Sequence, residues 1–523
     1  MNVLDTDIEA WHALVAAAPI GLLLWLMVRQ GWGAARAGPL ALVLAVVLSL
    51  TVFGTDLELV ARSQAKGALL SIWVLSIIWA ALLLFHLVDE TGEIQVIGAW
   101  LGRLAPGGAL QVLLLAWVFT SFLQGIAGYG VPVAVVAPLM VGNGFAPAVA
   151  VITTLIGHSW SVTFGSLAAS YSALAGVTGF GGDRLAIDSA LMLGLACLLC
   201  GAGAVLAFGG RKALASVAAP LLVTTVAMSG TQLGFAAVGA YSLAAFAAGT
   251  VGLIVMALCG RFLRCDPADL LGDSTTVGAG DFIRVFAAYA VLIGVVLTVS
   301  FVGPVERLLD RVRIELAFPA SSTSLGWANE ATDSYRTLSP FGDTGSLLLY
   351  AALIGYVIYR LIGIIEPGGL GRAAQRTVSS AVSSSVGIVA MVGMALAMTD
   401  SGMTFALASG LTTVVGAAFP MVSPLIGVLG AFMTGSNTNS NILFGALQRD
   451  TAQLLGVSVT PILAAQTTGG AIGSMLAPAK IIVGCSTVGL GGQEGPVLKA
   501  GIRYGLVIAG IIGATTLAWT AVT

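Results

Sequence analysis

The stretch Thr434-Gly-Ser-Asn-Thr-Asn-Ser-Asn441 decides the fold, because this run of polar and glycine residues interrupts an apolar region. Apolar segments 425–433 and 442–447 flank it, which favours a position at membrane depth over the alternative of an extramembrane turn. In hydrocarbon every backbone N–H and C=O needs a partner, so such a break is stable only inside protein or beside a water-filled cavity. We therefore expect a broken helix in the interior of a membrane protein.

The composition of the whole chain agrees with this expectation. Of 523 residues, 58% are hydrophobic and 9% are charged, and the mean hydropathy is +1.00. Soluble domains carry about 25% charged residues. The sequence therefore predicts an all-α polytopic membrane protein in a lipid bilayer. A net charge of −2 without a basic run predicts no nucleic-acid partner.

Apolar runs long enough to cross a bilayer recur along the chain, since about 20 residues are needed for one span. The clearest of them cover residues 12–28, 39–54, 67–88, 186–208, 233–259, 284–303, 346–365, 378–399 and 503–522. Irregular apolar stretches fill 109–180 and 400–490, while 261–283 and 304–345 are polar enough to be loops. We expect 12 to 14 transmembrane helices.

The two irregular stretches resemble each other. Ser121-Phe-Leu-Gln-Gly125 matches Ala431-Phe-Met-Thr-Gly435, and Gly165-Ser-Leu-Ala-Ala169 matches Gly473-Ser-Met-Leu-Ala477, at offsets of 310 and 308 residues. Two ordered matches at nearly equal offset predict repeated halves with broken helices or re-entrant hairpins. We assign 1–59 to N-terminal scaffold spans, 60–260 to the first repeat, 261–345 to a loop, a span and a long polar loop, and 346–523 to the second repeat. An odd number of spans between the matched breaks would make the repeats inverted, and an even number parallel.

Paired breaks of this kind are typical of secondary transporters. The first break is Gln124-Gly-Ile-Ala-Gly-Tyr-Gly-Val-Pro132, where three glycines and a proline interrupt a helix. Half-helix N-termini at a break present free N–H groups and a positive dipole end, which suit an anion. The alternative is a kink or close helix packing through small residues.

The residues of both breaks resemble the L-lactate permease family. The resemblance rests on 125–134, 434–448 and Thr467-Thr-Gly-Gly470, and it extends over roughly 10–520. It implies a symporter of the bacterial plasma (inner) membrane that imports lactate, glycolate and related 2-hydroxymonocarboxylates with protons. The chain departs from the family pattern at Gln124, where an acidic residue is expected, at Ser474, where a lysine is expected, and in Gly157-His-Ser-Trp160.

These observations give a set of candidate site residues. The substrate-binding candidates are Gly128, Tyr129, Gly130, Pro132, Ser436, Asn437, Thr438, Asn439, Ser440, Asn441, Thr467, Thr468 and Lys480. A cation near the bilayer centre costs about 3 kcal/mol, so Lys480 is either a counter-charge for the substrate or a side chain that reaches an interface. His158 and Asp400 are the candidates for carrying the coupling proton, against structural roles as a hydrogen-bonded histidine and a helix-end carboxylate.

Other function classes remain as alternatives. With three histidines and no HExxH, GxSxG or phosphate-binding loop motif in a matching context, an intramembrane enzyme or a primary pump is disfavoured. We expect no enzyme activity, no cofactor and no bound metal. The expected partners are a small organic acid anion and a coupling ion, with a proton favoured, and the sequence leaves the oligomeric state open. A sodium-coupled transporter of another organic acid and a channel stay open, because polar oxygens also bind cations and paired breaks also line pores.

Overall fold

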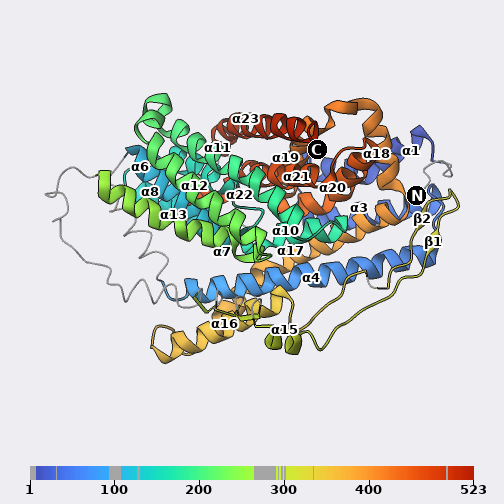
Figure 1. Ribbon diagram of the computed structural model, residues 1–523, viewed down its shortest axis with the longest axis horizontal. Helices are drawn as coiled ribbons and strands as arrows, with labels where there is room; N and C mark the ends of the chain where they lie inside the picture. The colour runs from blue at the N-terminus through green and yellow to red at the C-terminus, as the bar shows by residue number, and fades with distance from the viewer. Residues whose placement is uncertain are drawn as a thin grey trace.

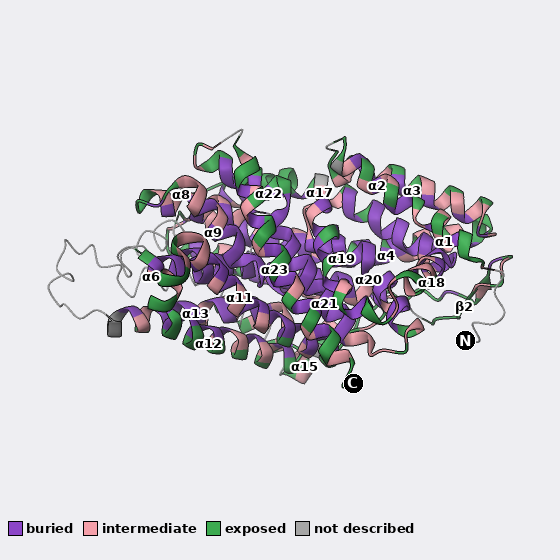
Figure 2. Ribbon diagram, turned by 90° about the horizontal axis from the view of Figure 1, so that it is seen from above, coloured by how far each residue is buried: buried purple, intermediate pink, exposed green. Residues whose placement is uncertain are grey.

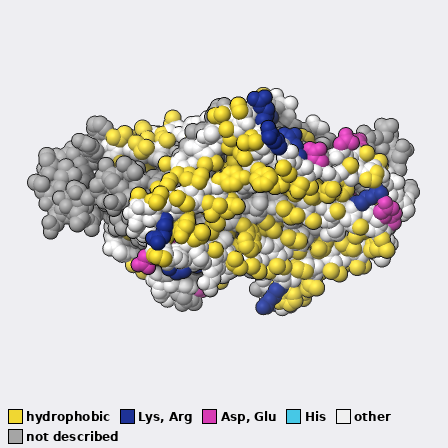
Figure 3. All heavy atoms as spheres, turned by 90° about the horizontal axis from the view of Figure 1, so that it is seen from below, with side chains coloured by type: hydrophobic (Ala, Val, Ile, Leu, Met, Phe, Trp, Pro, Cys, Tyr) yellow, Lys and Arg dark blue, Asp and Glu magenta, His cyan; other side chains and the backbone are white. Residues whose placement is uncertain are grey.

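The computed structural model describes residues 8–30, 32–92, 108–126, 130–263, 302–333, 335–490 and 493–523, with a few isolated positions between 290 and 299. Within these residues, ten helices are long and apolar enough to cross a membrane, or eleven with a bent helix pair. The protein is an all-α polytopic membrane protein, as predicted, although its described residues contain fewer spanning helices than the 12 to 14 expected. Figure 2 shows its buried interior, and Figure 3 shows apolar side chains across the middle of one face, with charged side chains toward the edges.

The helices follow one another in a simple order (Figure 1). The N-terminal part contains α1 (Ala10–Ala16), α2 (Ala18–Val28), α3 (Ala34–Thr51) and α4 (Leu57–Asp89). Next come α6 (Gly108–Val112), the π-helix η2 (Leu113–Phe119), α7 (Thr120–Ile126), α8 (Val131–Gly142), α9 (Pro147–Ser159), α10 (Gly165–Thr178), α11 (Asp183–Ser216), α12 (Ala218–Ala237) and α13 (Tyr241–Leu263).

The second part of the chain repeats much of this order. It contains α15 (Gly303–Leu309), β1 (Ser321–Ser322), β2 (Ala328–Asn329), α16 (Thr344–Leu361), α17 (Gly369–Asp400), α18 (Met403–Val415), η4 (Gly416–Ala418), α19 (Phe419–Thr434), α20 (Asn437–Leu454), α21 (Val459–Gly473), η5 (Ser474–Leu476), α22 (Pro478–Thr487) and α23 (Glu494–Thr520).

The helix starts reveal a structural repeat. The helices α3, α4, α6, α8, α9, α10 and α11 correspond in order to α16, α17, α19, α20, α21, α22 and α23, whose starts lie 306–313 residues later. The matched helices begin at α3, which falls within the predicted scaffold 1–59. The duplication inferred from two short sequence matches therefore extends over most of each half.

Contacts between the two halves are reciprocal. Helix α3 packs against α17 and α16 against α4, while α10 packs against α20 and α22 against α8. In the same way, α11 contacts α21, and α23 contacts α9. A two-fold axis relating the halves produces such exchanged contacts, as it does in a symmetric dimer.

Three sequence expectations need correction or comment. The apolar run 233–259 is not one span, because α12 ends at Ala237 and α13 begins at Tyr241, with Gly239 between them in a left-handed conformation (φ +76°). The sequence reading therefore missed α12, whose residues include three threonines and a glutamine among apolar ones. Most of the expected loop 261–283 and more than half of the expected span 284–303 lie outside the described residues.

The expected loop 304–345 contains a two-stranded ribbon. Antiparallel pairing joins Ile314 with Leu338 and β1 with β2, and the ribbon extends beside α4 (Figure 1). The Arg336 guanidinium lies 3.3 Å from the centre of the Trp73 ring of α4, and the Tyr335 hydroxyl donates to the Gly176 carbonyl of α10. Because pairing satisfies its own backbone groups, this polar segment packs against the helices instead of forming a loose connection.

Glycines allow the helices around the breaks to approach closely. A methyl group on Gly469 of α21 would lie 2.0 Å from the carbonyl oxygen of Pro424 in α19. In the first half, a methyl group on Gly157 of α9 would lie 1.9 Å from the carbonyl oxygen of Ala116 in η2. Because these are corresponding helix pairs, both halves use the same backbone-to-backbone packing.

We expect Gly469→Ala to destabilise the protein, because α19 and α21 would have to separate to admit the methyl group. The cost of such overpacking is about 1–3 kcal/mol. Thermal unfolding of the purified protein in detergent would measure the effect. Gly230→Ala on α12 is the control, since nothing lies within 4 Å of the added methyl group. Equal unfolding temperatures for the two variants would contradict this account of the packing.

Candidate functional site

Both predicted breaks contain a glycine that allows a sharp turn. Helix α19 ends at Gly435 with φ +75°, and Gly130 precedes α8 with φ +91°. These angles are accessible to glycine at little cost. The turn at Gly435 lets α20 begin two residues later, and the Ser436 side chain caps it by accepting from the Asn439 N–H. The N-terminus of α20, with its free N–H groups, therefore lies inside the protein.

A second pair of breaks separates α9 from α10 and α21 from α22. In the second half, η5 fills the break with ordinary backbone angles. In the first half, Ser166, Leu167 and Ala168 adopt φ values of 47°, 57° and 65°. Three consecutive residues other than glycine in the left-handed region are costly, and such strain is concentrated at functional sites.

A cavity lies where these breaks meet. It is small, with a volume of about 30 Å³. The lining side chains come from α7, α10, α20 and α22 and from the two breaks next to them, and they are Gln124, Val162, Ser166, Ala169, Ser170, Gly435, Ser436, Asn437, Thr438 and Lys480. Both halves of the protein thus contribute to one polar cavity.

A hydrogen-bonded network fixes the polar residues around the cavity. The Thr467 hydroxyl lies 3.1 Å from that of Thr163 and accepts a 2.8 Å bond from the Asn441 amide. The Asn437 amide donates to Thr163 at 3.1 Å, and Ser170 bonds with Thr438 at 2.9 Å. Because these bonds join α10, α20 and α21, they hold the first turn of α20 in one orientation.

Lys480 is the buried cation of the cavity. It lies in the first turn of α22 and is 6% exposed, and a methyl group on Gly130 would lie 3.9 Å from its Cγ. Within the described part of the chain, no carboxylate forms an ion pair with Lys480. A buried charge without a partner is strongly unfavourable, so this ammonium group is suited to an anionic ligand.

His158 is fully buried near this lysine. Its Nδ1 lies 2.8 Å from the Thr154 carbonyl oxygen, and its Nε2 has no hydrogen-bond partner within the part of the chain that the structure describes. A carbonyl oxygen accepts only, so Nδ1 carries the hydrogen, and Nε2 is left with the lone pair that can take a proton. The helices that carry His158 and Lys480, α9 and α22, pack against each other.

Asp400 lies apart from the cavity. Its carboxylate is 3.0 Å from the Lys66 ammonium and accepts a hydrogen bond from Ser63, both on α4. The Asn329 amide of the ribbon donates to its backbone carbonyl. These contacts connect α17 with α4 and with the ribbon. The Asp400 carboxylate therefore has a structural role and does not line the cavity.

The candidate residues therefore fall into three groups. Ser436, Asn437, Thr438 and Lys480 line the cavity, and Gly130 borders Lys480. The rest of the described candidates lie behind that lining or next to it, and they are Pro132, Asn439, Ser440, Asn441, Thr467 and Thr468. Gly128 and Tyr129 lie outside the described residues.

Sequence reasoning missed Ser166, Ser170 and Thr163. A signal for the first of them was present, because the sequence matches 165–169 with 473–477, immediately before Lys480. Two breaks related by the repeat face the same cavity, so Ser166 could have been placed opposite α22. Ser170 and Thr163 carried no separate signal, because serine and threonine are common in membrane helices.

Comparisons with known proteins agree with this architecture. A family model described as L-lactate permease matches residues 12–523. The chain is 27% identical to the glycolate permease GlcA of Escherichia coli, over 97% of this chain and 95% of that protein. It is 26% identical to the L-lactate permease of Bacillus subtilis, over 95% of this chain and 93% of that protein.

A solved structure has a similar fold. Neisseria gonorrhoeae MtrF superimposes with a TM-score of 0.52 at 12% identity, covering 94% of this chain and 96% of that chain. At this identity the likeness concerns the fold alone. The spanning helices and the match over nearly the whole chain identify a multi-pass plasma-membrane protein that belongs to the L-lactate permease family.

Proposed function

We propose that the protein imports a small 2-hydroxymonocarboxylate, such as lactate or glycolate, by proton symport. Family membership supports the transport of such an acid, and the relatives compared above are named for lactate and glycolate. Both acids combine one carboxylate with a neighbouring hydroxyl group. A cavity with one cation and neutral polar side chains fits this chemistry.

The observation that carries the proposal is the buried ammonium group of Lys480, which forms no ion pair with any described carboxylate. A carboxylate that enters the cavity would pair with Lys480 and receive further donors from the first turn of α20. Hydrogen bonds to charged groups contribute about 1.5–3 kcal/mol each. The binding of the substrate would thus remove the cost of the isolated buried charge.

Lys480→Met should abolish high-affinity uptake, because the apolar side chain keeps the volume of lysine but cannot pair with a carboxylate. Loss of one charged hydrogen bond corresponds to roughly a tenfold to hundredfold loss of affinity. Uptake of labelled lactate into proteoliposomes measures this effect. Lys499→Met, on the exposed face of α23, is the matched control. Unchanged affinity in Lys480→Met, at normal protein yield, would overturn the proposed site.

A proton symport step follows from the tautomer of His158. Its Nε2 is the atom that can gain a proton, and a protonated His158 and the Lys480 ammonium, on the packed helices α9 and α22, would repel each other. A carboxylate bound at Lys480 offsets this repulsion, so the binding of the substrate anion favours protonation of His158. Anion and proton would then be loaded together.

Charge balance explains why such coupling is useful. With a carboxyl pKa of about 4, these acids are anions at neutral pH. An inside-negative membrane potential opposes the entry of one negative charge by about 2.3 kcal/mol per 100 mV. Cotransport with one proton removes that penalty and adds the pH gradient as a driving force.

His158→Gln should lose accumulation driven by a proton gradient by tenfold or more, since the amide cannot be protonated at these pH values. Lactate exchange at equal pH should persist, because exchange needs no net proton movement. Both are measured in sodium-free proteoliposomes. His86→Gln is the control, since this buried histidine bonds with Thr377 between α4 and α17 and does not line the cavity.

Two results would contradict the proton step at His158. Proton-driven uptake at full rate in His158→Gln would make the histidine structural and leave Lys480 with the substrate as the proton-coupling pair. Uptake that requires a sodium gradient would replace the proton with sodium. The Oδ1 atoms of Asn437, Asn439 and Asn441 are buried and have no partner among the residues described, and amide oxygens are ligands that such a cation accepts.

A further inference from the structure

Gln124 is a buried neutral side chain at the wall of the cavity. It lies at the C-terminal end of α7 and is 2% exposed, and its Oε1 has no hydrogen-bond partner among the described residues. A methyl group on Gly165 would lie 2.8 Å from Nε2 and 3.0 Å from Cγ of this glutamine. Because Gly165 has no side chain, the Gln124 side chain can pack directly against the start of α10.

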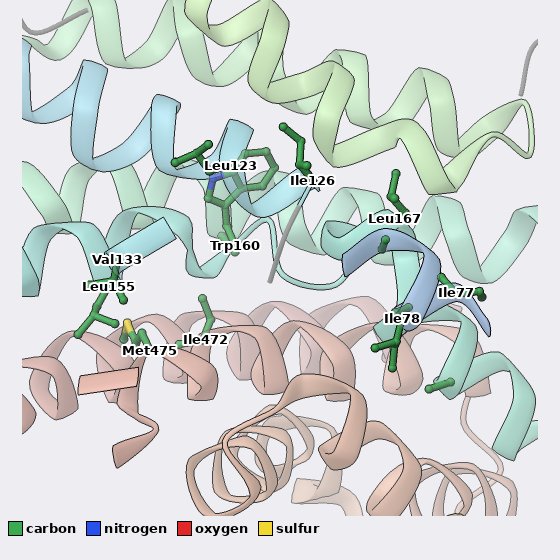
Figure 4. Close-up of a cluster of buried hydrophobic side chains, with 14 of the residues drawn as sticks. Ile77, Ile78, Leu123, Ile126, Val133, Leu155, Trp160, Leu167, Ile472 and Met475 are labelled. Carbon is green, nitrogen blue, oxygen red and sulfur yellow. The ribbon is translucent and has the colours of Figure 1, made fainter. Parts of the chain in front are cut away.

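The region around Gln124 is closely packed. The Trp160 indole donates to Ser121, one turn before Gln124 on the same helix, at 2.8 Å. Figure 4 shows Trp160 with Leu123 and Ile126 of α7, in the apolar cluster that also contains Ile472 and Met475 of the second half. The backbone that positions Gln124 is thus fixed by packing, which a selective site requires.

Most other polar groups of the cavity already have partners. Ser170 and Thr438 bond with each other, and the Asn437 amide donates to Thr163. The Asn437 Oδ1 is directed at α21, since a methyl group on Gly470 would lie 2.1 Å from it. On the same cavity wall, Gln124 offers a buried neutral amide oxygen and Lys480 a buried cation to a ligand.

We infer that Gln124 is a specificity-determining residue that recognises the 2-hydroxyl group of the substrate. The inference rests on the proposed function, in which Lys480 binds the carboxylate. The hydroxyl lies one carbon away from that carboxylate and can donate a hydrogen bond to the Oε1 atom of Gln124. An unsubstituted acid such as propionate leaves this buried oxygen without a partner, which is costly.

This arrangement separates affinity from selectivity. Lys480 contributes to the binding of every monocarboxylate, while Gln124 contributes only when a 2-hydroxyl group is present. A site that hydrogen-bonds a substrate hydroxyl discriminates strongly against the analogue that lacks it, because the polar group of the site is then buried and unpaired. A neutral amide also avoids placing a second negative charge beside the substrate carboxylate.

The test compares lactate with propionate as competitors of labelled lactate uptake, using the full-length protein in proteoliposomes. The wild type should bind lactate at least tenfold more tightly than propionate. Gln124→Leu should weaken lactate binding by tenfold to a hundredfold and leave propionate within about twofold, so that the preference disappears. Gln124→Met serves as a second apolar variant if the leucine variant does not fold.

Gln232→Leu on α12 is the matched control, because this glutamine is also buried with both amide atoms unpartnered, but it does not line the cavity. Its lactate preference should equal that of the wild type. A preference that survives in Gln124→Leu or Gln124→Met, or a wild type that binds propionate as well as lactate, overturns the inference and leaves the proposed function intact. A wild type that does not take up lactate overturns the proposed function itself.

Discussion

The structure depends on the need to satisfy backbone groups where helices break inside a membrane. Lipid offers no hydrogen-bond partners, so each break must be enclosed by protein or open to water. Here the breaks at Gly130 and Gly435 and the breaks before α10 and α22 are surrounded by helices from both halves. The reciprocal packing of the halves, with close contacts such as that of Gly445 in α20 with Leu174 in α10, creates that enclosure. The cavity exists because four helix ends meet there.

The charged residues inside the protein include those in ion pairs between helices and the lysine in the cavity. Among the described residues, the carboxylates and cations that link α4 with α17 are paired, as Asp400 is with Lys66 and Asp89 with Arg376. Lys480 lacks such a partner and lies in the cavity between the halves. A transporter needs an anion site that is complete only when the substrate is present, since binding can then alter the balance between conformations. Neutral donors and one cation in the cavity bind an anion, yet weakly enough for its release on the other side of the membrane.

Much of this architecture could be predicted from the sequence. The polar run at 434–441 stands out between apolar segments, and two short matches revealed the repeat, so the membrane class and both main breaks were predictable. Residues in the first turn of α20 were recognised because they are polar where a span should be apolar. Helix α12 was missed because its apolar content is diluted by threonine and glutamine and because a glycine turn separates it from α13.

The rest of the site depends on contacts that no local pattern encodes. Asp400 and Lys480 are both charged residues near helix ends in the sequence, yet the first meets Lys66 and the second meets no carboxylate among the described residues. Gln124 can be identified as a cavity residue only when α7, α10 and α22 are placed together. Asp400 and Lys66, like Gln124 and Lys480, are more than 300 positions apart in the chain. The local periodicity of the sequence does not predict that they lie close together.

The central claim is that the substrate carboxylate binds between the two halves at Lys480. Cryo-electron microscopy of the protein in lipid nanodiscs, with and without saturating lactate, tests it most directly. The account predicts ligand density that contacts the Lys480 ammonium and the first turn of α20 and that disappears without lactate. Lactate density elsewhere in the protein, with the cavity unchanged between the two maps, would contradict it.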